Sequence, residues 1–260
     1  MSQLIKFEFR KLFRSTSFLV CAIIAGVLLL INAFFLYDTY EVALESGVTG
    51  EEFNEVLSFL GISTFDLVYS FANNSFIYLL AGIFISLFVC ADYATLTIKN
   101  IYSKGYSRRK VYFAKYIVSL IGILSIVGVV YILSILSSLL IFGKIGPIPR
   151  NYFVVFLLQI LVIIVYHAFF FFIANSLGKS GAAVSICIII PTAVNLLTSL
   201  FDMSMEIENG ISNYWLSNLS SVVARMNVSG GDLGFVAIVS IGHILVWLGL
   251  GYLLNRKKSF

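Results

Sequence analysis

Residues 18–37 read FLVCAIIAGVLLLINAFFLY, a run of twenty residues that contains no charged side chain. Thirteen of them are Leu, Ile, Phe or Val. At roughly −0.3 to −0.6 kcal/mol each for membrane insertion, these residues supply about −6 kcal/mol, enough to carry the polar Asn32. Because a helix needs roughly 20 apolar residues to cross the bilayer core, this run predicts a transmembrane helix.

The rest of the chain repeats this pattern. Of its 260 residues, 60% are hydrophobic and only 12% are charged, whereas a soluble domain carries about 25% charged residues. Uncharged windows long enough to span a bilayer cover Ser15–Tyr37, Leu67–Ala91, Tyr116–Gly143, Asn151–Gly178, Ser180–Phe201 and Leu233–Asn255. The sequence therefore predicts an all-α polytopic membrane protein with six transmembrane helices, in a single transmembrane domain over residues 1–260.

The positions of Lys and Arg predict the orientation, because cytoplasmic connections are enriched in these residues. With both termini inside, 14 of the 17 basic residues lie on the cytoplasmic side. Residues 38–66 then form an outer loop with seven carboxylates and no basic residue, and residues 202–232 form a second outer loop. We predict an N-in, C-in topology. The apolar stretches of the second outer loop are too short to span, which indicates an interfacial or re-entrant helix.

A short amphipathic segment precedes the first span. Its apolar residues share one helical face: Ile5, Phe9, Leu12 and Phe13. Its basic residues lie largely on another: Lys6, Arg10 and Arg14. This pattern is typical of a helix in the headgroup plane with its basic face toward anionic lipid, although an ordinary basic flank is the alternative. We predict an interfacial helix over residues 1–14 that meets membrane lipid through Phe9, Arg10, Lys11 and Phe13.

A second amphipathic segment lies between spans two and three. Its apolar residues recur at helical spacing: Ala94, Ile98, Ile101 and Tyr102. Gly105 suits the residue that ends a helix, and Ser107 suits the cap of the helix that enters span three. We therefore predict a short cytoplasmic amphipathic helix. Its apolar stripe is covered either by the protein's own membrane surface or by a soluble partner.

Two segments carry a resemblance to a known family. Ile5–Ser15, and Ala91–Lys110 followed by Lys115, resemble the corresponding segments of ABC-2-type ABC-transporter permeases. Such permeases typically show an acidic residue, a small residue and a Thr, then a basic-apolar stretch, a turn, Ser-Arg and a later Lys. Asp92 stands here where Glu is more usual, and Ala94 where Gly is common. Within the family, the chain is similar to small permeases of antimicrobial-peptide immunity and drug export.

The resemblance implies the permease subunit of an ATP-driven exporter in the cytoplasmic membrane, with a peptide, drug or lipid-like substrate. A separate ATPase subunit would bind ATP and magnesium, so no cofactor is expected in this chain. A second permease copy, or a related permease, would complete the translocation unit. The implied ATPase-coupling interface consists of Asp92, Thr95, Ile98, Lys99, Ile101, Tyr102 and Arg108.

The chain itself carries no catalytic or metal-binding motif, and we expect it not to be an enzyme. Gly178-Lys179-Ser180 resembles the end of a P-loop, but the Gly required five residues earlier is Ile173, so we predict a tight turn. His167 and His243 stand alone, without metal-ligand spacing, and we expect each to hydrogen-bond a neighbouring span. The net charge of +4 is too weak to indicate nucleic acid.

Polar residues inside the predicted spans are candidates for a substrate path: Asn32, Asn74, His167 and Asn195. The alternative for each is a hydrogen bond between helices. No carboxylate lies within a predicted span, which argues against an ion-driven carrier and against a membrane enzyme. Two rival functions remain open: a membrane anchor that recruits a soluble partner without transport, and a stand-alone secondary transporter.

Overall fold

The computed structural model describes residues 2–45, 75–142, 152–206, 210–224 and 229–257. Within these residues every regular element is helical. The helices are α1 (Ser2–Arg14), α2 (Thr16–Glu45), α5 (Ser75–Ala94), α6 (Thr97–Ser103), α7 (Arg108–Phe142), α8 (Tyr152–Leu177), α9 (Ser180–Ser204), the short 3₁₀ helix η1 (Ile211–Tyr214), α10 (Leu216–Val223) and α11 (Gly230–Lys257).

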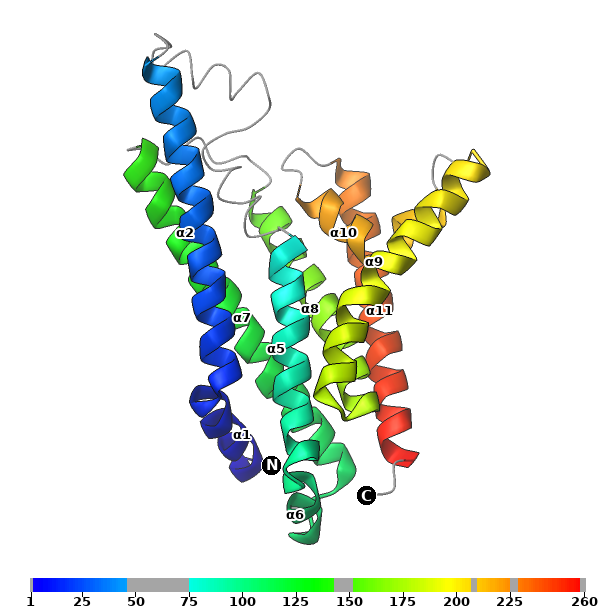
Figure 1. Ribbon diagram of the computed structural model, residues 1–260. Coiled ribbons are helices and arrows are strands. Elements are labelled where there is room, and N and C mark those ends of the chain that lie inside the picture. The colour runs from blue at the N-terminus through cyan, green and yellow to red at the C-terminus, as the bar shows by residue number, and fades with distance from the viewer. Residues whose placement is uncertain (1, 46–74, 143–151, 207–209, 225–228, 258–260) are drawn as a thin grey trace.

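Six of these helices are long and apolar enough to cross a membrane: α2, α5, α7, α8, α9 and α11. The prediction of an all-α polytopic membrane protein with six spans is thereby confirmed. α1 and the last turns of α11 lie at the same end of the bundle, as an even number of crossings requires (Figure 1). We call this end, which also holds α6, the α6 end, and the opposite one the α10 end.

The helix boundaries differ from the predicted spans because charge marks the edge of the bilayer but does not end a helix. α7 begins at Arg108 rather than Tyr116, and α2 continues past Tyr37 to Glu45. Lys, Arg and Glu are all good helix formers, so nothing in those flanks stops the helix. Residues 46–74, which include most of the predicted acidic outer loop and the start of the second predicted span, lie outside the described residues.

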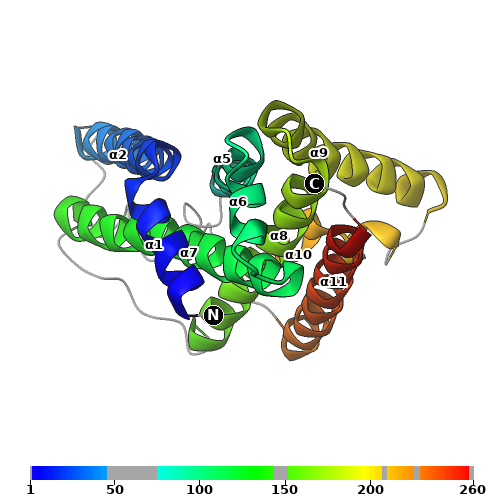
Figure 2. The same cartoon turned by 90° about the horizontal axis from the view of Figure 1, so that it is seen from below.

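The centre of the bundle is formed by α8, which contacts α5, α7, α9, α10 and α11. Figure 2 shows α8 and α5 between α2 on one side and α9 and α11 on the other. Phe84, Phe88, Phe170 and Phe171 are almost completely buried in the core. The outer helices α2, α9 and α11 expose long apolar faces, as helices surrounded by lipid do.

The predicted helix of the last outer connection is present and is buried by the protein itself. Leu216, Leu219 and Val223 on α10 are all but inaccessible, and α10 contacts α8, α9 and α11. The Asp202 carboxylate accepts hydrogen bonds from the backbone N–H of Ile211 at 2.9 Å and of Ser212 at 2.8 Å. These bonds hold the start of η1 against the end of α9.

Pro191 lies inside α9, where its missing N–H removes one backbone hydrogen bond and favours a bend. Figure 1 shows the helix changing direction along its length, so that its last turns lean away from the bundle. The Trp215 indole nitrogen, just before α10, donates to the Pro191 carbonyl at 3.0 Å. This contact ties the bend in α9 to the position of α10.

Candidate functional site

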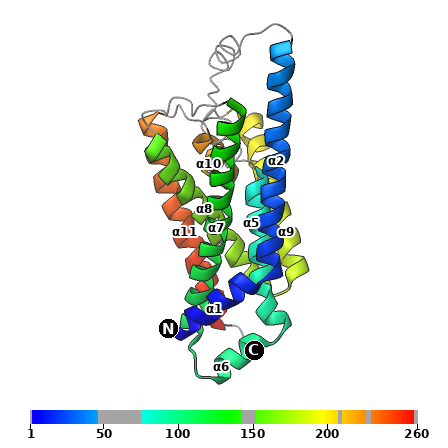
Figure 3. The same cartoon turned by 90° about the vertical axis from the view of Figure 1, so that its left-hand side faces the viewer.

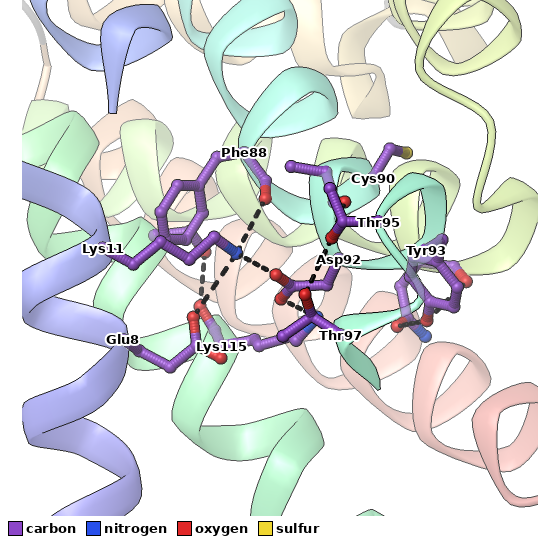
Figure 4. Close-up of polar contacts among 12 residues, drawn as sticks. Glu8, Lys11, Phe88, Cys90, Asp92, Tyr93, Thr95, Thr97 and Lys115 are labelled. Atoms are coloured by element: carbon purple, nitrogen blue, oxygen red, sulfur yellow. Dashed lines mark hydrogen bonds and ion pairs between the residues drawn. The ribbon is translucent and has the colours of Figure 1, made fainter. Parts of the chain in front are cut away.

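Four ionisable side chains from three helices meet at the α6 end. We call them the charge cluster: Glu8, Lys11, Asp92 and Lys115 (Figure 4). The Lys11 ammonium lies 2.6 Å from one Asp92 oxygen, and the Lys115 ammonium pairs with the other. Lys11 also lies 3.6 Å from a Glu8 oxygen and donates to the Phe88 carbonyl at 3.3 Å. One aspartate therefore joins α1 and α7 to the last turn of α5.

The local sequence brings these helices close enough for the ion pairs to form. The helix breaks at Ser15, so that α1 turns away from the axis of α2 and lies across the end of α7 (Figure 3). A Cβ atom on Gly122 of α7 would lie 2.9 Å from Leu12 Cδ1 and 2.8 Å from the Phe84 ring. Gly122 thus permits the close approach of α1, α5 and α7 directly beside the cluster.

The cluster is almost fully removed from solvent. The side chains of Asp92 and Lys115 are 3% and 2% exposed, and that of Lys11 is 22% exposed. Buried charges are tolerated only when they are paired, and here two lysines face two carboxylates. Glu8 is completely buried, and burial raises the pKa of its carboxyl, an effect that the neighbouring Lys11 ammonium partly offsets.

The amphipathic helix predicted between spans two and three is α6. Its apolar residues Ile98 and Ile101 are 3% and 6% exposed and form a small cluster with Leu4 of α1 and Val111 and Ala114 of α7. The sequence left open whether the protein itself or a soluble partner covers this apolar stripe. In the structure, α1 and α7 cover Ile98 and Ile101. These two side chains are therefore not available for direct contact with a soluble partner in this structure.

The turns around α6 follow the sequence signals. Gly105 adopts a φ of +79°, and its N–H donates to the Tyr102 carbonyl at 2.9 Å, as expected for the residue that ends a helix. α7 starts at the residue after Ser107. Leu96, between α5 and α6, takes a φ of 55°, a left-handed conformation that a bulky residue rarely adopts. The chain is thus sharply bent on both sides of α6.

The residues of the implied coupling interface occupy three different settings. Thr95, which precedes α6, and Lys99, which is in α6, are exposed, and Tyr102 is half-buried. Arg108 is exposed and donates to the Arg256 carbonyl of α11 at 2.7 Å. Asp92, assigned from the sequence to the connection after span two, instead lies in the last turn of α5 inside the charge cluster, because two lysines compensate its burial.

The residues of the predicted interfacial helix are also divided. Arg10 and Phe13 are exposed, and Phe9 is half-buried and stacks on Phe13 with ring centroids 6.4 Å apart. Lys11 turns inward to Asp92. The buried face of α1 consists of Leu4, Glu8 and Leu12. Sequence reasoning missed Glu8, although an acidic residue four positions from two leucines on one helical face was the available signal.

The candidate substrate-path residues do not converge. Asn32 is exposed on α2, Asn195 is half-buried on α9, and these helices lie on opposite sides of the bundle (Figure 2). Asn74 lies outside the described residues. His167 is buried, and its Nε2 lies 2.9 Å from the Ser119 hydroxyl of α7, which confirms the expected hydrogen bond to a neighbouring span. His243 instead contacts the Val239 carbonyl of its own helix at 3.0 Å.

A second polar region lies beneath α10. A cavity of about 380 Å³ separates α5, α8, α9 and α10, and no charged residue lines it. Its walls carry hydroxyl groups from Tyr78, Tyr166, Thr192, Ser217, Ser220 and Ser221. The Tyr78 and Tyr166 rings stack with centroids 4.1 Å apart. This cavity could not be predicted from the sequence, because its lining residues come from four separate elements.

The described part of the chain offers no metal site, since it contains no group of three or more His, Cys, Asp or Glu that could hold an ion. Cys21, Cys90 and Cys187 form no disulfide and are buried, as expected for apolar packing residues. Gly178 takes a φ of +67° in the short connection between α8 and α9. Its Gly-Lys-Ser sequence therefore forms the tight turn that was predicted.

These features define the class of the protein: a helical, multi-pass membrane protein whose spans are joined to α1 by ion pairs and to α6 by apolar packing. Residues 4–195 match the model of the ABC-2 family transporter proteins. The match covers most of the chain and includes both segments that carry the resemblance, so the chain belongs to the ABC-2 transporter family. No curated protein matches it. Members of this family generally work with an ABC ATPase.

Proposed function

We propose that the chain is the permease subunit of an ATP-driven exporter in the cytoplasmic membrane, with both termini in the cytoplasm. A separate ATPase subunit binds ATP and magnesium and hydrolyses the nucleotide. A second permease copy, or a related permease, completes the translocation unit. Family membership and the six spans support this assignment, and the substrate class remains a peptide, drug or lipid-like compound.

The observation that carries the proposal is the two-sided environment of α6. One face, through Ile98 and Ile101, packs against α1 and α7. The other presents Lys99 and Asn100 to solvent. A soluble protein that binds the exposed face can therefore move α6, and the packed face transmits the movement to the spans.

The charge cluster completes this mechanical connection. Asp92 lies in the last turn of α5, a few residues before α6 begins, and it is paired with lysines of α1 and α7. Ion pairs in a low-dielectric interior hold their geometry strongly, because separating them leaves a buried charge without a partner. In the proposed mechanism the exposed Thr95, Lys99 and Arg108 contact the ATPase, while Asp92, Ile98, Ile101 and Tyr102 transmit its movement.

Charge reversal on the exposed face of α6 tests the proposal. Lys99→Glu combined with Lys104→Glu should reduce co-purification with the ATPase by at least about tenfold, because like charges placed across an interface cost several kcal/mol. Vanadate-sensitive transport in proteoliposomes should fall in parallel. Lys179→Glu, an exposed reversal in the α8–α9 turn, is the matched control. Unchanged co-purification in the double variant would remove α6 from the coupling role.

The same assay separates the two rival functions. A membrane anchor would co-purify with its soluble partner but would show no vanadate-sensitive transport. A secondary transporter would transport without an ATPase and would respond to an ion gradient instead of vanadate. The proposal requires both co-purification and vanadate-sensitive transport from the same complex.

Orientation has its own test. Lys104 directly follows α6 and Met205 directly follows α9, and both are exposed. α6 and the last turns of α9 lie at opposite ends of the bundle (Figure 1). A cysteine at Met205 should react with an impermeant thiol reagent on intact cells, and a cysteine at Lys104 should react only after permeabilisation. The three native cysteines are buried, which keeps the background low. Labelling of Lys104→Cys on intact cells would reverse the topology.

A further inference from the structure

Besides the cavity beneath α10, the structure has a cavity at the α6 end. It lies between α1 and the junction of α5 with α6. Its volume is about 360 Å³. One wall is a single face of α1, and the other is the end of α5 and the start of α6. The cavity is lined by Phe7, Arg10, Lys11, Arg14, Ala91, Asp92, Thr95 and Thr97. We call it the basic cavity.

The basic cavity has an excess of positive charge. Asp92 is already paired with Lys11 and Lys115. Arg10 and Arg14 are exposed, and within the described residues neither forms an ion pair. Two like charges four residues apart on a helix repel each other. The guanidinium groups of Arg10 and Arg14 therefore have no carboxylate partner within the described part of the chain.

The surroundings of the cavity are apolar on the exposed side. Phe7 on its wall is 46% exposed, and Leu96, between the two lining threonines, is 56% exposed. Beyond Arg14 the chain breaks at Ser15 and enters α2, whose first turns expose Leu19 and Val20 at 50% and 51%. A free inorganic anion would use only the arginines, whereas an amphipathic anion would use the arginines and these apolar side chains together.

We propose that the basic cavity binds the phosphate group of an anionic membrane lipid, with Arg10 and Arg14 as its ligands. Arginine is suited to this role because its planar guanidinium binds phosphate oxygens in a bidentate manner. The acyl chains extend along the exposed apolar residues at the start of α2. The site lies between two elements of this chain, α1 and the junction of α5 with α6.

Lipid binding to the purified full-length protein tests the proposal. Native mass spectrometry compares retention of phosphatidylglycerol with that of phosphatidylcholine. The test variant is Arg10→Gln combined with Arg14→Gln. The matched control is Arg109→Gln combined with Lys110→Gln, which removes the same charge from exposed residues of α7 at the same end but outside the cavity.

The preference for phosphatidylglycerol should fall about thirtyfold in the test variant, since each basic residue near an anionic lipid contributes about fivefold. The control should keep the wild-type preference. Arg10→Lys combined with Arg14→Lys retains the charge and loses the bidentate geometry, so its preference should lie between wild type and the glutamine variant. This variant also guards against a glutamine variant that fails to fold.

Four results would overturn the proposal. The first is an unchanged lipid preference in the glutamine variant. The second is an equal loss in the α7 control, which would indicate a diffuse basic surface. The third is displacement of the lipid by inorganic phosphate at equal concentration, which would assign the cavity to a free anion. The fourth is loss of ATPase co-purification with an intact lipid preference, which would make the arginines a protein contact.

Discussion

The two ends of the bundle satisfy their buried polar groups in different ways. At the α6 end, carboxylates and ammonium groups of the charge cluster pair across α1, α5 and α7. At the α10 end, the cavity is lined by hydroxyl groups without a charge, and the carboxylate of Asp202 is satisfied by backbone N–H groups. The α6 end is held by ion pairs between side chains, and the α10 end by hydrogen bonds, including those from backbone N–H groups to the Asp202 carboxylate.

The two kinds of contact imply different rigidity at the two ends of the bundle. Removing one partner of a buried ion pair leaves an uncompensated charge, so the three helices of the charge cluster must keep their relative positions. Neutral hydrogen bonds between membrane helices are worth far less, about 0.6 kcal/mol each. The α6 end is thus suited to transmit a movement, and the α10 end can repack around a bound molecule.

We expect the largest loss of stability when the central carboxylate, Asp92, is removed. Asp92→Ala leaves the buried Lys115 without its ion-pair partner, and we expect the free energy of unfolding to fall by about 3–5 kcal/mol. Titration with a denaturing detergent in mixed micelles measures the loss. Asp92→Ala combined with Lys115→Met removes the charge pair as a whole and should recover much of that stability. Equal loss in both variants would show that the ion pair is unimportant.

A smaller effect is expected where the three helices approach each other. A methyl group on Gly122 would meet the buried Leu12 and Phe84 side chains at 2.9 and 2.8 Å, so Gly122→Ala should destabilise the protein by about 1–3 kcal/mol. Gly128→Ala is the matched control, because a Cβ atom there meets nothing within 4 Å. It should be neutral, or stabilise α7 by about 0.5–1 kcal/mol. The two alanine variants are compared by the same detergent titration.

The neutral hydrogen bond between spans should give a still smaller effect. Ser119→Ala removes the hydroxyl that lies 2.9 Å from His167 Nε2, and we expect a loss of about 0.6 kcal/mol. A loss comparable with that of Asp92→Ala would remove the contrast between ionic and neutral contacts on which our interpretation depends. Hydrogen exchange of the α7 and α8 backbone is a second measurement of the same change.

Glu8 tests the sign of an electrostatic effect. Burial raises the pKa of its carboxyl above the usual 4.5, so the folded state favours the protonated form. The stability that Glu8 contributes is therefore complete below pH 4.5 and is lost as the pH rises through the raised pKa. Glu8→Gln carries no titratable group at this position, so this variant does not lose that stability as the pH rises. The stability of this variant relative to wild type should increase from acid to neutral pH, and a constant difference would contradict the burial effect.

Much of the fold could be predicted from the sequence, because single-helix properties determine it. The lengths of the apolar windows predicted the six spans, and helical periodicity predicted α1 and α6. The turns at Gly105 and Gly178 follow from a conformation that glycine adopts easily. Each of these features depends on residues close together in the chain.

The candidate site could be predicted only in part, because it depends on contacts between distant residues. Asp92 was expected in the connection after span two, and nothing local indicated that Lys11 and Lys115 would enclose it. The coverage of Ile98 and Ile101 depends on how α1 and α7 pack beside α6. The apolar stripe could be predicted from the sequence, but the helices that cover it could not.

Coupling through α6 is tested most directly by identifying the protein that contacts the exposed face of α6. A photoreactive amino acid at Asn100, which is exposed on α6, is activated in whole cells, and the crosslinked protein is identified by mass spectrometry. The same label at Met205, exposed at the opposite end, is the control. We predict a P-loop ATPase as the partner from Asn100 and none from Met205. An ATPase crosslinked from Met205 alone, or no ATPase from either position, would contradict the proposed coupling through α6.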